Sequence, residues 1–177
     1  VHDSGDGPSA PTPSPGPAGG VPATLFYNAK RGDATLCISE LCRKTQTASG
    51  YTVLFEEGYA PAPDVQPMYA SPLYFAWSSA NEDNWVTADA RQPGPSYTNF
   101  GNADGNVWKD GGGNRLAVVE FTLDADAAAG NGKAHHIAAA SNASKAWALA
   151  RGYAAGATLG YLDALGPTPP PTPPPAP

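Results

Sequence analysis

The sequence predicts an all-β domain built from three similar repeats, with a proline-rich segment at each end. Two observations support this prediction. Residues 1–23 and 166–177 hold 14 of the 20 prolines and contain no lysine or arginine. The residues between them contain all four tryptophans and repeat one sequence pattern three times. The chain therefore divides into an N-terminal arm (1–23), one globular domain (24–165) and a C-terminal tail (166–177).

The charge of the chain excludes two classes of partner. The formal net charge is −6 at pH 7, and no cluster of lysine and arginine is present to meet phosphates. We therefore expect no nucleic-acid partner. No apolar run approaches the roughly 18 residues that a membrane helix needs. We therefore expect no membrane insertion either.

The clearest internal repeat relates residues 34–59 to residues 136–161. Both segments contain GY, six residues, and GY again, and they align at a constant offset of 102 without a gap. A middle copy is clearest at its start, where LFYNAK aligns with LYFAWS at an offset of 48. The same offset aligns Trp85 with Cys37. Self-similarity of this kind is the mark of a repeat architecture. The three repeats span residues 24–66, 72–110 and 115–164.

Each repeat predicts about four short strands. An apolar strand comes first, a second strand ends in serine or threonine, and two more strands begin near the two Gly-Tyr pairs. SELCRKTQTASG (39–50) and SNASKAWALARG (141–152) predict short helices, because each begins with a serine cap and ends at glycine. In the middle repeat the two prolines of ADARQPGPS (88–96) predict a loop instead.

Three repeats that cannot bury their own faces favour closure around a pseudo-threefold axis. The predicted fold is therefore β-trefoil-like, with polyproline-II tails. Four tyrosines are expected at equivalent and largely buried places, namely Tyr51, Tyr59, Tyr153 and Tyr161.

Two segments resemble a repeat found in secreted bacterial, fungal and algal proteins. They are PLYFAWSSANEDNWVT (72–87) and ASGYTVLFEEGYAP (48–61), and the family pattern runs P-L-Y-x-x-W-S, D-N-F-T-T, G-Y and E-G-Y before a proline. The resemblance covers nearly all of 24–164 and departs in the third repeat, where HHIAAAS replaces the aromatic strand. It implies a β-trefoil-like fold, an extracellular location and a glycan ligand. The Gln-x-Trp signature of ricin-type lectins is absent, so no sugar site carries over from them.

The tails resemble the hydroxyproline-rich segments of algal and plant extracellular matrix proteins. PTPSP and PTPPPTPPP are the stretches that carry this resemblance. It implies hydroxylation and O-glycosylation of the C-terminal tail, and the residues that we expect to be modified are Thr168, Pro169, Pro170, Thr172 and Pro173.

Two further covalent features are predicted. Cys37 and Cys42 either form a small local disulfide, as expected outside the cell, or remain buried thiols, and we predict the disulfide. Asn142 begins the only N-glycosylation sequon, Asn-Ala-Ser, so we predict a glycan there.

No catalytic centre emerges from the sequence. His135 and His136 form the only histidine pair, but no carboxylate or cysteine stands at a spacing typical of catalysis or metal binding. We interpret the pair as structural and predict no metal, no cofactor and no enzymatic activity. Aromatic residues are the remaining candidates for binding glycans or a proline-rich tail, because their faces suit both. These candidates are Tyr69, Tyr74, Trp77 and Trp108.

The sequence therefore predicts a secreted, glycosylated structural protein. At about 3.1 Å per residue, the eleven residues 167–177 reach roughly 34 Å, which is long enough to lie on a neighbouring copy. The partners expected are other copies of the same chain, joined into a homopolymer, and glycans. The alternative is a carbohydrate-binding module of a secreted modular enzyme, with the tails as spacers.

Overall fold

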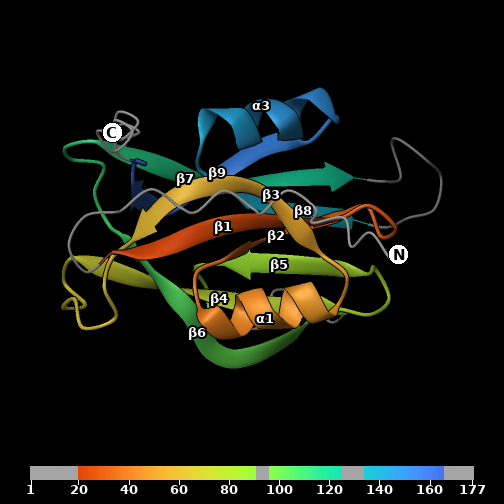
Figure 1. Ribbon diagram of the computed structural model, residues 1–177, viewed down its shortest axis with the longest axis horizontal. Coiled ribbons are helices and arrows are strands. Elements are labelled where there is room, and N and C mark those ends of the chain that lie inside the picture. Colours follow the sequence, from red (N-terminus) through yellow and green to blue (C-terminus); the bar gives the residue numbers. More distant parts are fainter. Residues whose placement is uncertain (1–19, 91–95, 125–133, 166–177) are drawn as a thin grey trace, which may run out of the picture.

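The computed structural model describes residues 20–90, 96–124 and 134–165 (Figure 1). Within these residues the fold is all-β with two short helices, as predicted. Strand β1 begins at Val21, so the last residues of the predicted arm belong to the sheet. The tail residues expected to carry sugar lie outside the described ranges. The elements are β1 (Val21–Asn28), β2 (Asp33–Cys37), α1 (Glu40–Ala48), β3 (Thr52–Ala60), β4 (Ala70–Ser78), β5 (Asp83–Thr87), β6 (Thr98–Trp108), β7 (Arg115–Asp124), β8 (Ala134–Ala139), α3 (Asn142–Ala150) and β9 (Ala154–Asp163).

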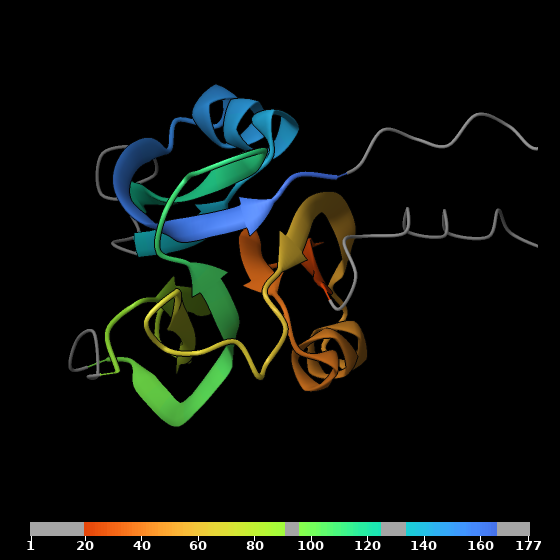
Figure 2. The same ribbon diagram turned by 90° about the vertical axis from the view of Figure 1, so that its left-hand side faces the viewer.

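The strands form three units with the same antiparallel pairing. In repeat 1, β1 pairs with β2 and β3; in repeat 2, β4 pairs with β5 and β6; in repeat 3, β7 pairs with β8 and β9. Figure 2 shows the units as three groups of strands beside one another. Strands β3, β6 and β9 also meet, through the pairs Tyr59–Asp163 and Trp108–Tyr161.

Each repeat contains three strands within the described residues rather than the expected four. The two strands expected at the Gly-Tyr pairs form one long strand, interrupted by a bulge just before the second glycine. The bulge residues are Glu57 in β3, Asp104 in β6 and Leu159 in β9. A glycine must follow the bulge, because a Cβ on Gly58 would collide with the Asp163 carbonyl oxygen of β9.

The bulges also fix how the repeats correspond. Residues paired with the glycine after the bulge are Ala23, Leu73 and Val118. The 102-residue offset between repeats 1 and 3 holds for the long strands, where it takes Gly58 to Gly160, whereas the first strands correspond at an offset of 95, from Ala23 to Val118. The first strands of repeats 1 and 2 correspond at an offset of 50, from Ala23 to Leu73, rather than 48. The expected match of Trp85 with Cys37 is therefore wrong, because β1 starts earlier than its apolar letters indicate.

The core lies between the repeats and draws on all three. Its largest fully buried apolar side chains are Leu25, Leu36, Leu73, Val107, Val118, Ile137 and Leu162. Tyr51 and Tyr153 are both buried, and the new register adds Tyr97, also buried, as their counterpart in repeat 2. Tyr59 is buried, whereas Tyr161 is only half-buried.

Both helices begin as the sequence predicts. Ser39 caps α1 by accepting a hydrogen bond from the Cys42 backbone, and Ser141 caps α3 by accepting one from Ser144. The Cys37–Cys42 disulfide is present and ties the end of β2 to the first turn of α1. The described part of segment 88–96 contains no helix, in keeping with its prolines.

Candidate functional site

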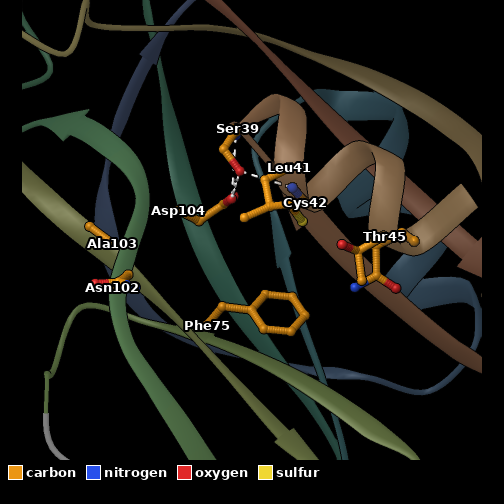
Figure 3. A pocket seen from close by; sticks show the side chains of 9 residues that line it. Ser39, Leu41, Cys42, Thr45, Phe75, Asn102, Ala103 and Asp104 are labelled. Carbon is orange, nitrogen blue, oxygen red and sulfur yellow. Dashed lines mark hydrogen bonds between the residues drawn. The ribbon is translucent and has the colours of Figure 1, made fainter.

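An open groove runs between helix α1 of repeat 1 and strands β4 and β6 of repeat 2. It consists of two adjoining cavities of about 350 and 310 Å³. Both cavities are lined by Thr45, Gln46 and Phe75, which makes them one continuous depression. Figure 3 shows the larger cavity, with the α1 side chains on one wall and Phe75 facing them. We call this depression the open groove.

The open groove is mainly apolar. Leu41 stands at its mouth with 76% of its surface exposed, an unusual exposure for a leucine on a helix wall. Phe75 and Trp77 form the floor, and both are half-buried. Ala103 contributes to the opposite wall. Exposed apolar surface that lines a hollow commonly marks a binding site.

The corresponding groove between α3 and β1 is filled by the chain itself. Trp147 lies in α3, and its ring centroid is 5.3 Å from that of Tyr27 and 6.5 Å from that of Phe55, edge-on in both cases. Such edge-to-face arrangements are favourable for aromatic rings. Tyr27 and Trp77 correspond, because each pairs with the threonine that follows a buried tyrosine. We call this second site the filled groove.

The difference between the two grooves depends on one helix position. Trp147 is the sixth residue after the cap Ser141, and the sixth residue after the cap Ser39 is Thr45. Leu25, two residues before Tyr27 on β1, is fully buried. Its counterpart Phe75 in the open groove is not. The open groove is therefore the filled groove without its tryptophan.

Polar groups lie at the rim of the open groove. The Arg31 guanidinium lies 5.3 Å from the Trp77 ring centroid, within the range of a cation–π contact. Asn102 lies at the other end, with its side chain exposed. These side chains offer N–H donors beside an apolar floor. The groove therefore suits a ligand with an apolar surface and carbonyl or hydroxyl acceptors.

Carboxylates at two bulges, the buried Glu57 and the half-buried Asp104, hold the start of each helix in place. Asp104 of repeat 2 accepts hydrogen bonds from the Ile38 backbone at 2.8 Å and from the Ser39 hydroxyl and backbone. Glu57 of repeat 1 accepts from the backbones of Ala140 and Ser141, both at 2.6 Å. Burial raises the pKa of both carboxyl groups above their ordinary values, while these hydrogen bonds oppose the rise.

The third junction lacks both partners of this contact. Leu159 takes the place of the bulge carboxylate in repeat 3. The described residues 88–90 of repeat 2, where a helix would begin, form no helix. Among the residues that the structure describes, the carboxylate and the capped helix thus occur together at two junctions and neither is seen at the third. Glu57 and Asp104 are therefore joints between repeats.

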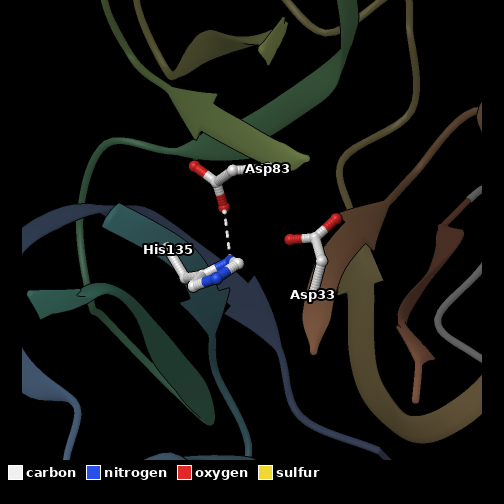
Figure 4. A group of neighbouring side chains, drawn as sticks. All are labelled: Asp33, Asp83 and His135. Carbon is white, nitrogen blue, oxygen red and sulfur yellow. Dashed lines mark ion pairs between the residues drawn. The ribbon is translucent and has the colours of Figure 1, made fainter. Parts of the chain in front are cut away.

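A second polar cluster lies where β2, β5 and β8 approach one another. Figure 4 shows Asp33, Asp83 and His135 directed toward one another from three repeats. One ligand-type atom from each residue lies within 4.8 Å of the others. Two carboxylates and an imidazole are a possible ligand set for a transition metal.

The hydrogen bonds of this cluster favour a structural role. Asp33 accepts from the Tyr51 hydroxyl of its own repeat and from the Asn84 side chain of the next, both at 2.5 Å. Asp83 accepts from the Tyr97 hydroxyl at 2.6 Å and from His136, whose backbone nitrogen is 2.9 Å away. Each aspartate thus joins one repeat to the next.

The pKa values of the two aspartates are shifted in opposite directions. Burial raises the pKa of Asp33 to about 8, and the neighbouring charge of Asp83 adds to the rise. Burial acts on Asp83 in the same direction, but the nearby His135 imidazole and the hydrogen bonds from His136 and Tyr97 outweigh it and lower its pKa. At neutral pH the pair therefore carries one negative charge, on Asp83.

Of the four predicted binding aromatics, only Trp77 lies in the groove. Tyr69 is exposed in the connection before β4, and Tyr74 is half-buried on that strand. Trp108 is held elsewhere: its indole donates to Asp163 at 2.9 Å, and the Arg115 guanidinium lies 4.1 Å from its ring centroid. Sequence reasoning missed Leu41, Thr45 and Phe75. The 102-residue offset contained the signal for one of them, since it aligns Thr45 with Trp147.

The remaining predicted sites take simpler positions. Asn142 is exposed in the first turn of α3, where a glycan would project into solvent. His135 and His136 lie in β8 and join the aspartate cluster, as described above. No helix among the described residues is long and apolar enough to cross a membrane. Comparison of the chain with family models, with curated proteins and with solved structures finds no match.

Proposed function

We propose that this chain is a secreted, non-enzymatic structural protein whose proline-rich arms join one copy to the next in an extracellular polymer. The observation that carries the proposal is the common exit of the two arms. Tyr59 in β3 pairs with Pro22 on one side and with Asp163 on the other. The first and last strands therefore bring both arms to the same end of the domain.

The composition of the arms supports a role in contact. In residues 167–177 only Thr168, Thr172 and Ala176 carry a backbone amide donor. Such a segment cannot extend a helix or the middle of a sheet. It is already stiff, so binding costs little conformational entropy, and proline-rich segments commonly dock in aromatic-lined grooves. The Cys37–Cys42 disulfide is typical of proteins from oxidising compartments, which supports secretion.

The proposal includes closure of the three repeats about a pseudo-threefold axis, as in a β-trefoil. Its support is that each repeat contacts the other two: repeat 1 binds repeat 2 through Asp33, repeat 2 binds repeat 3 through Asp83, and repeat 1 binds repeat 3 through Glu57. An experimental structure tests this part directly. Segments 34–59 and 136–161 are expected to superpose with the same strand path, and different paths would refute the three-fold arrangement.

Deletion of residues 167–177 tests the assembly. The full-length chain, purified from its native source or a glycosylating host, is expected to form polymers that are visible by electron microscopy and light scattering. The shortened chain is expected to remain monomeric at the same concentration. Unchanged assembly after the deletion, or a full-length chain that stays monomeric at high concentration, would overturn the proposal.

A second function, carbohydrate binding, is favoured by the open groove itself. Trp77 and Phe75 present aromatic surface, and the rim carries Arg31 and Asn102. Aromatic faces suit the apolar face of a sugar ring, while the rim could bind its hydroxyls. Calorimetric titration with cell-wall oligosaccharides tests this function. Saturable binding that Trp77→Ala abolishes, in a chain that forms no polymer, would favour it over assembly.

A further inference from the structure

We propose that the open groove is the receptor for the C-terminal arm, residues 167–177, of a second copy of this chain. This inference rests on the proposed assembly through the arms and names the surface that receives one of them. It starts from the comparison of the two grooves. The same pair of walls encloses an indole in the filled groove and lacks one in the open groove, because Thr45 replaces Trp147.

The filled groove shows what kind of group fits. Its occupant is a flat apolar ring that lies edge-on to Tyr27 and Phe55. Proline rings are the apolar rings that the arm offers, and five of the eight in residues 167–177 are not among the positions expected to carry sugar, namely Pro167, Pro171, Pro174, Pro175 and Pro177. The arm contains no charged side chain, and the groove floor of Phe75 and Trp77 offers none either. The occupant and the floor therefore match in polarity.

The rim matches the backbone of such a segment. A proline-rich chain exposes many carbonyl acceptors and few amide donors. The rim carries the donors Arg31 and Asn102, at opposite ends of the groove. Hydrogen bonds from side-chain donors to carbonyl oxygens would fix the arm along the groove, while the rings fill the floor.

Geometry favours an arm from another copy over the arm of the same chain. Strand β9 carries the chain to the end where Asp163 meets Tyr59, and the Ala164 amide is bound there to the Asn114 carbonyl. The groove lies between repeats 1 and 2, whereas the chain leaves the domain from the last strand of repeat 3. A polyproline segment is stiff over several residues and does not reverse direction within one or two. Contact between the arm of one copy and the side of another is heterologous, and such contacts build open chains.

Thr45→Trp is the first variant of the test, because it places in the open groove the residue that fills the other one. Thr47→Trp is the matched control: Thr47 is an exposed threonine of the same helix that does not line the groove. The Thr45→Trp chain is expected to lose polymer formation while its melting temperature is unchanged or higher. The Thr47→Trp chain is expected to assemble like the wild type.

Mixing two assembly-defective chains makes the test specific. A chain without residues 167–177 keeps the groove, and the Thr45→Trp chain keeps the arm. Together they are expected to form a dimer of twice the monomer mass by light scattering, although each alone is monomeric. A mixture that contains only monomers would overturn the proposal, because an arm that docks in its own chain gives no dimer.

Two further results separate this inference from the assembly on which it rests. If the arm deletion abolishes polymers but Thr45→Trp does not, assembly through the arms stands and the groove is not the receptor. If Thr45→Trp does not fold, the peptide PTPPPTPPPAP added in excess to the wild-type chain decides the matter. Competition that slows polymer growth and changes Trp77 fluorescence, with Trp77→Phe as the reference, supports the groove. No competition at millimolar peptide would contradict it.

Discussion

Thr45 in α1 occupies the position that Trp147 occupies in α3, and this exchange leaves one groove open and the other filled. Trp147→Ala should therefore create a second open groove at a cost to stability. We expect a loss of about 3 kcal/mol, near the lower end for removal of a packed tryptophan because Trp147 is only half-buried. Urea denaturation gives the value. Trp77→Ala removes a ring with no tryptophan packed on it and should lower the free energy of unfolding by less. Equal losses for the two variants would argue against the comparison of the two grooves.

Glu57 connects repeat 1 to the start of α3. Glu57→Ala leaves the buried amides of Ala140 and Ser141 without their acceptor, and we expect a loss of about 3 kcal/mol in the free energy of unfolding. The neighbouring Glu56 is the control, because its carboxylate bonds only to the Thr24 hydroxyl, at 3.3 Å, among the described residues. Glu56→Ala should cost less than about 1 kcal/mol. Equal losses in the free energy of unfolding for Glu57→Ala and Glu56→Ala would contradict the role of Glu57 as a joint between repeats.

The Asp33–Asp83 pair predicts a dependence of stability on pH. The pKa of Asp33 is raised from 3.8 to about 8 in the folded chain, so folding binds a proton that the unfolded chain releases. The contribution of this Asp33 proton to the free energy of unfolding declines as pH rises from about 4 to about 8. The pKa of Asp83 is lowered, so its contribution is lost in the opposite direction, as pH falls below about 4.

We therefore expect the melting temperature to be highest near pH 4 and to decrease toward pH 8. Asp33→Asn, which imitates the protonated side chain, should flatten the decrease. Calorimetric melting at a series of pH values measures both profiles. If the Asp33→Asn chain has the same slope as the wild type, another group causes the dependence.

The disulfide closes a short loop, so its contribution should be modest. Replacing both Cys37 and Cys42 by serine should lower the free energy of unfolding by about 2 kcal/mol. The loss should be concentrated at α1, which the disulfide anchors at its first turn, and hydrogen exchange of the α1 amides should rise most. Exchange that increases equally in α1 and α3 would contradict this local effect.

Glycosylation of Asn142 and of the C-terminal tail is a prediction that mass spectrometry tests. Asn142 is exposed, so we expect a glycan there in protein from a glycosylating source, and tryptic peptides of an Asn142→Gln variant should lose that mass. Sugar on Thr168, Pro169, Pro170, Thr172 and Pro173 should place the intact mass well above 18.1 kDa. Unmodified peptides at these positions would refute this part of the account.

The sequence predicted the repeats because glycine and tyrosine are constrained by backbone and core. Gly58 and Gly160 follow the bulges, where a side chain would collide with a neighbouring strand. Glycine is therefore required at both positions, and the pair shows the 102-residue offset between the repeats. Capping serines and the prolines of the loop predicted two helices and one loop by local chemistry alone. The offset of repeat 2 was misjudged, because β1 begins with Val21-Pro22-Ala23, which reads as part of the arm.

The groove could not be predicted in the same way. Whether the groove is open depends on the side chain at one helix position. Thr45 has no distinguishing feature in the sequence of its own helix, and its importance appears only when it is compared with Trp147. The joints at Glu57 and Asp104 depend on contacts between residues far apart in sequence, which no local pattern reveals. Trp77 was identified as a candidate, whereas Trp108 is engaged with Asp163 and Arg115, and only the fold separates the two.

The central claim is that the arm of one copy lies in the groove of another, and photo-crosslinking tests it most directly. Phe75, on the groove floor, is replaced by p-benzoylphenylalanine in a ¹⁵N-labelled chain, which is mixed with unlabelled chains and irradiated. Val53, which is exposed on β3 outside the groove, carries the same probe as the control. We predict that position 75, but not position 53, crosslinks to peptides of residues 166–177 from an unlabelled chain. Crosslinks confined to the same chain, or absent from the arm, would contradict the account.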